Sequence, residues 1–167
     1  APAEEAHTPE QIEPFASKAP PGSVYFRPIT RTPGVTLARS TLDNAVFTSK
    51  EGLDKGEREL AAADSSKVND CVYCASVHAR KAVQRTHRAD DVDRMLAIDL
   101  TRDANWVASD VTALAAGQDE RWTALIESAA RLAALAPQFD ETDAKRLRDL
   151  GLAELEIVDH VASTAFF

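Results

Sequence analysis

The stretch "GERELAAADSSKVNDCVYCASVH", residues 56–78, decides the fold prediction, because two helical segments meet within it. Its first half is rich in residues that favour helices. After a polar turn at Asn69 and Asp70, the chain continues without a helix-breaking residue, and either side chain of that turn can cap a helix that begins at Cys71. The stretch therefore predicts two consecutive helices, with a CxxC pair at the N-terminus of the second.

The rest of the chain from about Gly34 shows the same helical pattern. Apolar residues recur at three- and four-residue steps, and Gly or Pro stands where several of these runs end. The further expected helices cover residues 36–50, 90–100, 105–117, 121–137, 140–151 and 152–167. The sequence contains no confident strand pattern, internal repeat or glycine-rich phosphate loop. We predict an all-α protein.

Proline is concentrated at the start of the chain. Seven of the eight prolines fall in the first 33 residues. Proline lacks a backbone N–H and has a fixed φ, so this composition favours an extended arm over packed helix. The predicted organisation is a proline-rich arm over residues 1–33 and a single compact helical domain over residues 34–167.

Charge and hydropathy exclude several classes of partner. The chain carries 27 acidic and 19 basic residues, a formal net charge of −8. Nucleic acids and anionic membranes are bound mainly through clustered Lys and Arg, so neither is expected as a partner. No apolar run has the roughly 18 residues that a membrane helix needs, and the first residues do not resemble a secretory signal. We expect a cytoplasmic protein.

The two cysteines of the chain share one helix face with a histidine. At roughly 100° per residue, Cys71, Cys74 and His78 fall within about 60° of one another. The helix N-terminus also provides unpaired N–H groups and a positive dipole end, which favour a thiolate. A second thiol nearby can capture a sulfenic acid as a disulfide before it is oxidised further. The pattern is compatible with a redox pair, half of a metal site or a local structural disulfide, and the redox pair is favoured.

Metal and haem binding are the weaker alternatives. A structural zinc site normally has four ligands, and here only Glu59 and His78 would complete a set with the two cysteines. A haem attachment motif needs a histidine directly after the second cysteine, where this chain has Ala75. We therefore expect no cofactor and no metal.

The spacing of these residues resembles the signature of the alkylhydroperoxidase D (AhpD-like) proteins in the carboxymuconolactone decarboxylase superfamily. That signature is a Glu, eleven residues, CxxC, three residues and a His, and it matches Glu59, Cys71, Cys74 and His78 in type and spacing. The resemblance covers roughly residues 34–167. It implies an all-helical thiol peroxidase; the decarboxylases proper lack this cysteine pair, so decarboxylation is not implied.

The resemblance also implies a role for each residue. Cys74 would attack the hydroperoxide, Cys71 would resolve the product as a disulfide, and Glu59 with His78 would relay protons. Position along the helix dipole alone would favour Cys71 as the more acidic thiol. The chain departs from the best-known members at Tyr73, where they have a histidine, and a phenol is a poor base at neutral pH. Tyr73 is at most an auxiliary residue.

Two main functional hypotheses follow. The first is an antioxidant peroxidase that reduces organic hydroperoxides or hydrogen peroxide through a dithiol–disulfide cycle, with an external dithiol reductant such as a lipoyl group or a thioredoxin-like protein. The second is a redox-responsive binding or regulatory protein that uses the same disulfide. A metal-binding helical protein is a third, weaker alternative. The resemblance also implies a homo-oligomer, such as a dimer, trimer or hexamer, in which the arm could clasp a neighbouring subunit.

Overall fold

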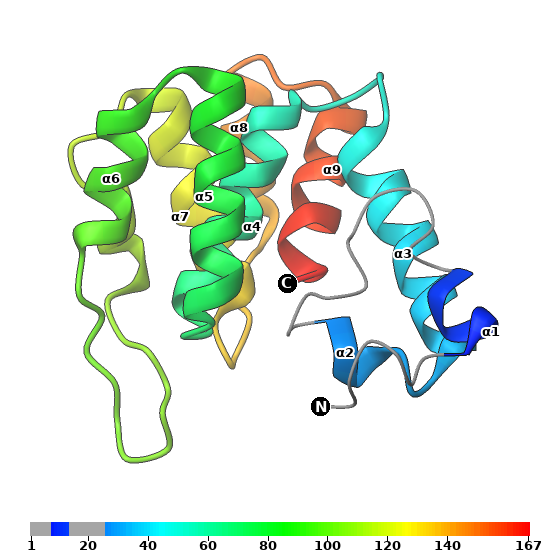
Figure 1. Cartoon of the computed structure of the whole chain (residues 1–167). Coiled ribbons are helices and arrows are strands. Elements are labelled where there is room, and N and C mark those ends of the chain that lie inside the picture. The colour runs from blue at the N-terminus through cyan, green and yellow to red at the C-terminus, as the bar shows by residue number, and fades with distance from the viewer. Residues whose placement is uncertain (1–7, 14–25) are drawn as a thin grey trace. The chain divides into compact units, whose positions relative to one another are not determined.

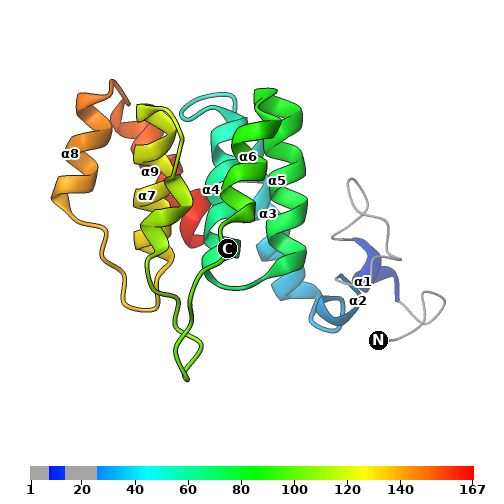
Figure 2. The same ribbon diagram turned by 90° about the vertical axis from the view of Figure 1, so that its left-hand side faces the viewer.

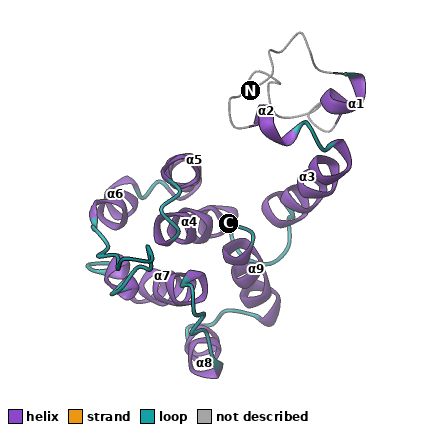
Figure 3. Ribbon diagram, turned by 90° about the horizontal axis from the view of Figure 1, so that it is seen from below, coloured by secondary structure: helices purple, strands orange, loops and turns teal. Residues whose placement is uncertain are grey.

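A computed structural model describes residues 8–13 and 26–167 (Figure 1). Figure 3 shows only helices and loops among these residues, and the one ladder-type pairing described is an isolated bridge between Arg102 and Ala108. The all-α prediction is confirmed. The chain forms two compact units that divide between Thr48 and Ser49.

The first unit contains α1 (Pro9–Ile12), α2 (Phe26–Ile29) and α3 (Pro33–Thr48). Proline is the first residue of α1 and of α3, where its missing N–H costs nothing. The buried Thr36 hydroxyl donates to the carbonyl oxygen of Ile29 (2.6 Å), which ties the start of α3 to the end of α2.

The predicted extended arm over residues 1–33 lies largely outside the described residues. Its described parts contain the one-turn helices α1 and α2, together with the first residue of α3. The boundary at residue 33 stays a prediction.

The second unit is built around α4 (Lys55–Val68). Its other elements are α5 (Val72–Thr86), α6 (Ala89–Ala97), the 3₁₀ helix η3 (Val111–Ala115), α7 (Glu120–Ala133), α8 (Glu141–Asp149) and α9 (Glu154–Ala165). Helix α4 packs against α5, α7 and α9, and Figures 2 and 3 show it in the middle of this group. Twelve of its fourteen residues are buried. A polar side chain on α4 is thus placed inside the protein, where it needs a partner or loses its charge.

Aspartates begin three of these helices. The carboxylates of Asp54, Asp119 and Asp140 accept backbone N–H groups in the first turns of α4, α7 and α8. The helix expected over residues 140–151 thus begins at this last cap.

The cap expected for the cysteine helix is wrong. Cys71 itself is the N-cap residue of α5, and it makes no side-chain capping bond. Asn69 ends α4, and Asp70 adopts a left-handed conformation (φ 59°) in the turn between the helices. Asp tolerates this conformation better than most residues, which lets α5 fold back sharply along α4.

The helix expected over residues 105–117 is also wrong. Residues 105–110 form a loop, and only the short η3 follows. The Asp103 carboxylate accepts the backbone N–H groups of Asn105 (2.8 Å) and Val107 (2.9 Å), a local arrangement that competes with helix formation. The loop projects beyond the helix ends in Figures 1 and 2.

Candidate active site

A buried carboxylate and a buried imidazole meet between α4 and α5. Oε2 of Glu59 lies 2.6 Å from Nδ1 of His78, and the two residues are only 1% and 4% exposed. An ionised carboxylate has no proton to give, so Nδ1–H of His78 is the donor. In the neutral ring, Nε2 then carries a lone pair that can accept a proton.

The two thiols lie at the start of α5, near the surface. Cys71 is the N-cap, Cys74 is the third helical residue, and both are partly exposed. The N–H of Cys71 donates to the carbonyl of Ser66 (2.8 Å), and its carbonyl accepts the first helical bond, from Ala75 (2.9 Å). These two bonds fix the backbone of Cys71 between α4 and α5.

This placement suits dithiol chemistry. Both cysteines belong to the described residues, and neither is joined in a disulfide. Side chains three and four residues apart lie on one helix face, so Cys74 is a neighbour of both Cys71 and His78. The positive end of the α5 dipole stabilises negative charge on either sulfur. The arrangement can therefore form and break a disulfide beside a proton acceptor.

The last aromatic residues of the sequence cover the imidazole. The rings of His78 and Phe167 meet edge to face with centroids 4.1 Å apart, and Phe166 packs against Phe167 at 5.0 Å. Nδ2 of Asn69 donates to the carbonyl oxygen of Phe167 (3.3 Å), which holds this residue over the turn between α4 and α5. The aromatic contact shields part of the His78 ring from water.

Two cations approach the other oxygen of Glu59. Nζ of Lys81 lies 3.6 Å and Nε of Arg85 lies 3.8 Å from Oε1, and both side chains are less than half exposed. From the sequence alone, Lys81 would lie on another face than His78 as a solvated surface residue, and this interpretation is wrong. Arg85 was not singled out. Their spacing from His78, three and seven residues, places all three on one face of α5 and was the available signal.

The projecting loop is attached to the turn before the cysteines. Nε1 of Trp106 donates to Oδ2 of Asp70 (3.1 Å), and a guanidinium N–H of Arg102 donates to the carbonyl of Lys67 (3.0 Å). The Trp106 residue is 66% exposed and has a left-handed backbone (φ 67°). This tryptophan is a second feature that the sequence analysis missed.

The candidate residues thus divide into two sets. The structure places Glu59 in hydrogen-bond contact with His78, and it places Cys71 and Cys74 at the start of the helix that also carries His78. Tyr73 is half exposed on the outer side of that helix start. Their catalytic roles remain predictions.

The described residues contain neither a metal-binding cluster nor a membrane-spanning helix. In residues 8–13 and 26–167, no three His, Cys, Asp or Glu side chains are grouped closely enough to hold a metal ion. Over the same ranges, no helix combines the length and apolar character that a membrane crossing requires.

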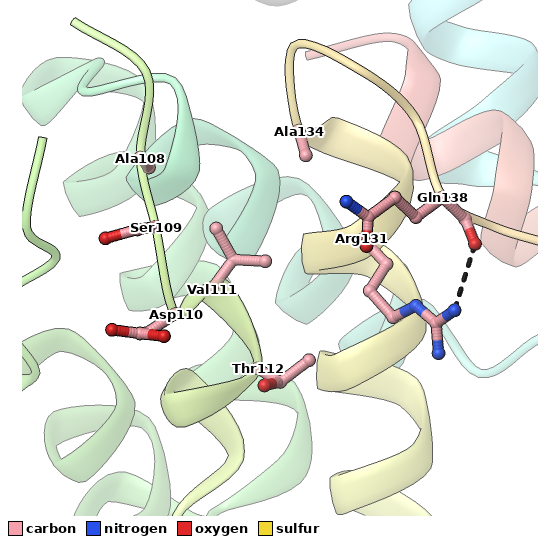
Figure 4. A pocket seen from close by; sticks show the side chains of 8 residues that line it. All are labelled: Ala108, Ser109, Asp110, Val111, Thr112, Arg131, Ala134 and Gln138. Atoms are coloured by element: carbon pink, nitrogen blue, oxygen red, sulfur yellow. Dashed lines mark hydrogen bonds between the residues drawn. The ribbon is translucent and has the colours of Figure 1, made fainter. Parts of the chain in front are cut away.

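A separate cavity of about 360 Å³ lies between the projecting loop with η3 and the end of α7 (Figure 4). Arg131 and Gln138 line one side, and residues 108–112 line the other. The Arg131 guanidinium donates to the Gln138 carbonyl (3.1 Å) and pairs with Asp143 (3.2 Å). Its charge is thus already balanced within the protein, and none of the thiol-site residues lines this cavity.

Comparisons with known proteins agree with this architecture. A crystal structure from Ralstonia eutropha JMP134, described as an alkylhydroperoxidase AhpD core and an uncharacterized peroxidase-related protein, matches with a TM-score of 0.74 and 24% identity over 99% of this chain and 81% of that one. An uncharacterized peroxidase-related protein from Silicibacter sp. TM1040 matches with a TM-score of 0.62 and 24% identity, over 80% of this chain and 63% of that one. At this identity the likeness establishes the fold.

The search of curated proteins gave no match. The sequence model of the carboxymuconolactone decarboxylase family matches residues 33–119, which include Glu59, both cysteines and His78. This range is just over half of the 167 residues. The chain therefore belongs to the carboxymuconolactone decarboxylase family, with an AhpD-like fold.

Proposed function

We propose that this protein is a thiol-dependent peroxidase that reduces hydroperoxides through Cys71 and Cys74. The observation that carries the proposal is the buried Glu59–His78 hydrogen bond of 2.6 Å, placed one helical turn from Cys74. A buried carboxylate that orients an imidazole beside a nucleophile is the usual arrangement for activating it. The peroxidase-related descriptions of the two similar structures support the same class of activity.

The first step consumes the hydroperoxide. Nε2 of His78 accepts the thiol proton of Cys74, and the thiolate attacks the terminal oxygen of ROOH. The S–O bond forms as the O–O bond breaks, the alkoxide leaves as ROH with a proton returned from the imidazole, and Cys74 becomes a sulfenic acid.

The second and third steps restore the dithiol. The Cys71 thiolate attacks the sulfur of the sulfenic acid, so that the S–S bond forms and hydroxide leaves as water after taking the proton released by Cys71. An external dithiol then reduces the Cys71–Cys74 disulfide and becomes a disulfide itself. The sum is ROOH plus dithiol giving ROH, water and the oxidised reductant. A lipoyl or thioredoxin-like reductant and a reducing, cytoplasmic setting fit this cycle.

Peroxide consumption with a panel of dithiol reductants tests the proposal. Wild type should turn over many times, whereas Cys74→Ser should lose at least about a thousandfold in rate because the attacking sulfur is gone. Cys71→Ser should react once and then stop. Full activity in both variants would overturn the proposal.

The Trp106–Asp70 hydrogen bond supports a second candidate, a redox-responsive binding protein. A large exposed aromatic side chain is typical of binding surfaces, and this one is tied to the residue directly before Cys71. A change at Cys71 on disulfide formation would reach the loop through Asp70. The peroxide-consumption assay distinguishes the two functions. If the protein consumes one equivalent of peroxide and then stops with each dithiol reductant of the panel, the binding function is favoured over the peroxidase.

A further inference from the structure

We infer that Lys81 and Arg85 are positioning residues, which supply the counter-charge of Glu59 so that His78 can accept a proton at Nε2. The inference rests on the proposed function and adds to it two residues outside the Glu, CxxC and His signature. It is drawn from the distances of both cations to Oε1 of Glu59, 3.6 and 3.8 Å.

The two oxygens of Glu59 have different surroundings. Oε2 accepts the Nδ1–H of His78, whereas Oε1 faces the two cations. Glu59 itself is 1% exposed, while Lys81 and Arg85 are 44% and 40% exposed. The cations therefore remain hydrated and positively charged and still act on a carboxylate that water does not reach.

Close packing of α4 against α5 holds the cations near Glu59. A Cβ atom on Gly56 would lie 2.3 Å from Cγ2 of Thr86 and 3.1 Å from Cβ of Arg85. Glycine at this position thus lets the end of α5 approach the start of α4. This close approach brings the side chain of Arg85 near the carboxylate of Glu59. The neighbouring carboxylate Glu57 is occupied separately, because Arg121 binds it through two bonds of 2.7 Å.

Charge balance explains why the cations matter. Without them, the buried carboxylate would be neutralised by one additional proton on the Glu59–His78 pair. That proton gives either an imidazolium or a protonated Glu59 that donates to Nδ1, and in both states Nε2 carries hydrogen. The ring could then accept no proton from Cys74. With the cations present, the carboxylate stays ionised while the ring remains neutral.

The charges of α5 agree with this role. The helix contains three cations and no acidic residue, in a chain with a net charge of −8. Lys81 and Arg85 approach Glu59, whereas Arg80 is exposed on the same helix. Arg80→Gln is therefore a matched control that removes the same charge from the same helix.

The test compares Lys81→Gln, Arg85→Gln, the double variant and Arg80→Gln in the full-length protein. Nitrogen-15 NMR of His78 should show Nε2 unprotonated at pH 7 in wild type and Arg80→Gln, and protonated in a larger fraction of the double variant. The acidic limb of the first-turnover rate with tert-butyl hydroperoxide should move to higher pH. At pH 7 the rate should fall roughly fivefold in each single variant. Lys81→Arg, which keeps the positive charge, should retain the wild-type rate.

The two readouts separate this inference from the proposed function. If wild type does not turn over peroxide but Nε2 still gains a proton in the double variant, the peroxidase proposal fails and the positioning role stands. If the wild-type enzyme turns over but the double variant matches Arg80→Gln in both Nε2 protonation and pH profile, the inference is overturned. Circular dichroism of each variant verifies that the helices are retained, so a folding defect is not mistaken for either outcome.

Discussion

Two of the three buried carboxyl groups of helix α4, those of Glu59 and Asp64, have contrasting surroundings. Glu59 accepts a hydrogen bond from His78 and faces two cations. Asp64 lies five residues further along, is fully buried, and neither of its oxygens has a hydrogen-bond partner among the described residues. Desolvation raises the pKa of Asp64 well above its usual value. Burial thus favours the neutral form of Asp64, whereas Glu59 has the partners that an ionised carboxylate needs.

The two histidines that are buried in the described part of the chain differ in the same way. His78 hydrogen-bonds a carboxylate beside the thiols, whereas Nε2 of His160 in α9 lies 2.9 Å from the hydroxyl of Ser128. Nδ1 of His160 has no partner within the described residues, and burial lowers the pKa of this ring to about 4. Burial alone therefore gives a neutral residue with a structural role. A charged partner and a nearby nucleophile make the same residue types suitable for catalysis.

Among the changes that test this contrast, the largest effect is expected when the carboxylate beside His78 is removed. Glu59→Gln keeps the shape of the side chain but cannot stabilise a ring that accepts a proton, so peroxide turnover should fall about a hundredfold. Asp64→Asn on the same helix should leave turnover unchanged. Steady-state peroxide consumption measures both. Equal losses in the two variants would mean that α4 packing, and not the Glu59–His78 pair, determines the rate.

The next effect is a pH-dependent stability that comes from His160. Its folded pKa of about 4 lies below the unfolded value of 6.5, so the unfolded chain binds the proton more readily. Stability is full above pH 6.5 and falls as the pH drops to about 4, by on the order of 3 kcal/mol. Urea unfolding at pH 4 and pH 7 should show this loss in wild type and a smaller loss in His160→Gln. The exposed His87→Asn variant is the control, and an identical pH dependence in all three proteins would contradict the assignment.

The smallest effect is the opposite pH dependence of Asp64. Its folded pKa is raised, so its contribution to stability is full below about pH 4 and is lost as the pH rises. Asp64→Asn removes this loss, so its free energy of unfolding relative to that of the wild type should increase between pH 4 and pH 8. Urea unfolding of both proteins at the two pH values measures the difference. A difference that stays constant with pH would show that Asp64 titrates normally.

The sequence predicted the features that depend on local spacing. Helices α4 and α5, the helix that begins near residue 140 and the shared face of Cys74 and His78 all follow from periodicity and helix propensity. The eleven-residue interval between Glu59 and Cys71 indicated a common site through the family resemblance. The structure explains this interval, because the sharp turn at Asp70 folds α5 back along α4 and so brings the two helices side by side.

Features that depend on tertiary packing could not be read from the sequence. The burial of Asp64 within α4 raises its pKa, although the sequence context of this residue resembles that of an exposed helix. The segment around Trp106 has good helical periodicity, but the Asp103 turn overrides it. Lys81 looked like an ordinary surface residue, because only the position of α4 reveals that it faces Glu59.

The most direct measurement is chemical trapping of the oxidised sulfur. Cys71→Ser is treated with one equivalent of tert-butyl hydroperoxide and dimedone, and the labelled residue is identified by mass spectrometry. If Cys74 attacks the hydroperoxide, this variant should carry a dimedone adduct on Cys74, and the wild-type protein should contain a Cys71–Cys74 disulfide. Absence of both products under peroxide would contradict the claim that these two sulfurs reduce hydroperoxides.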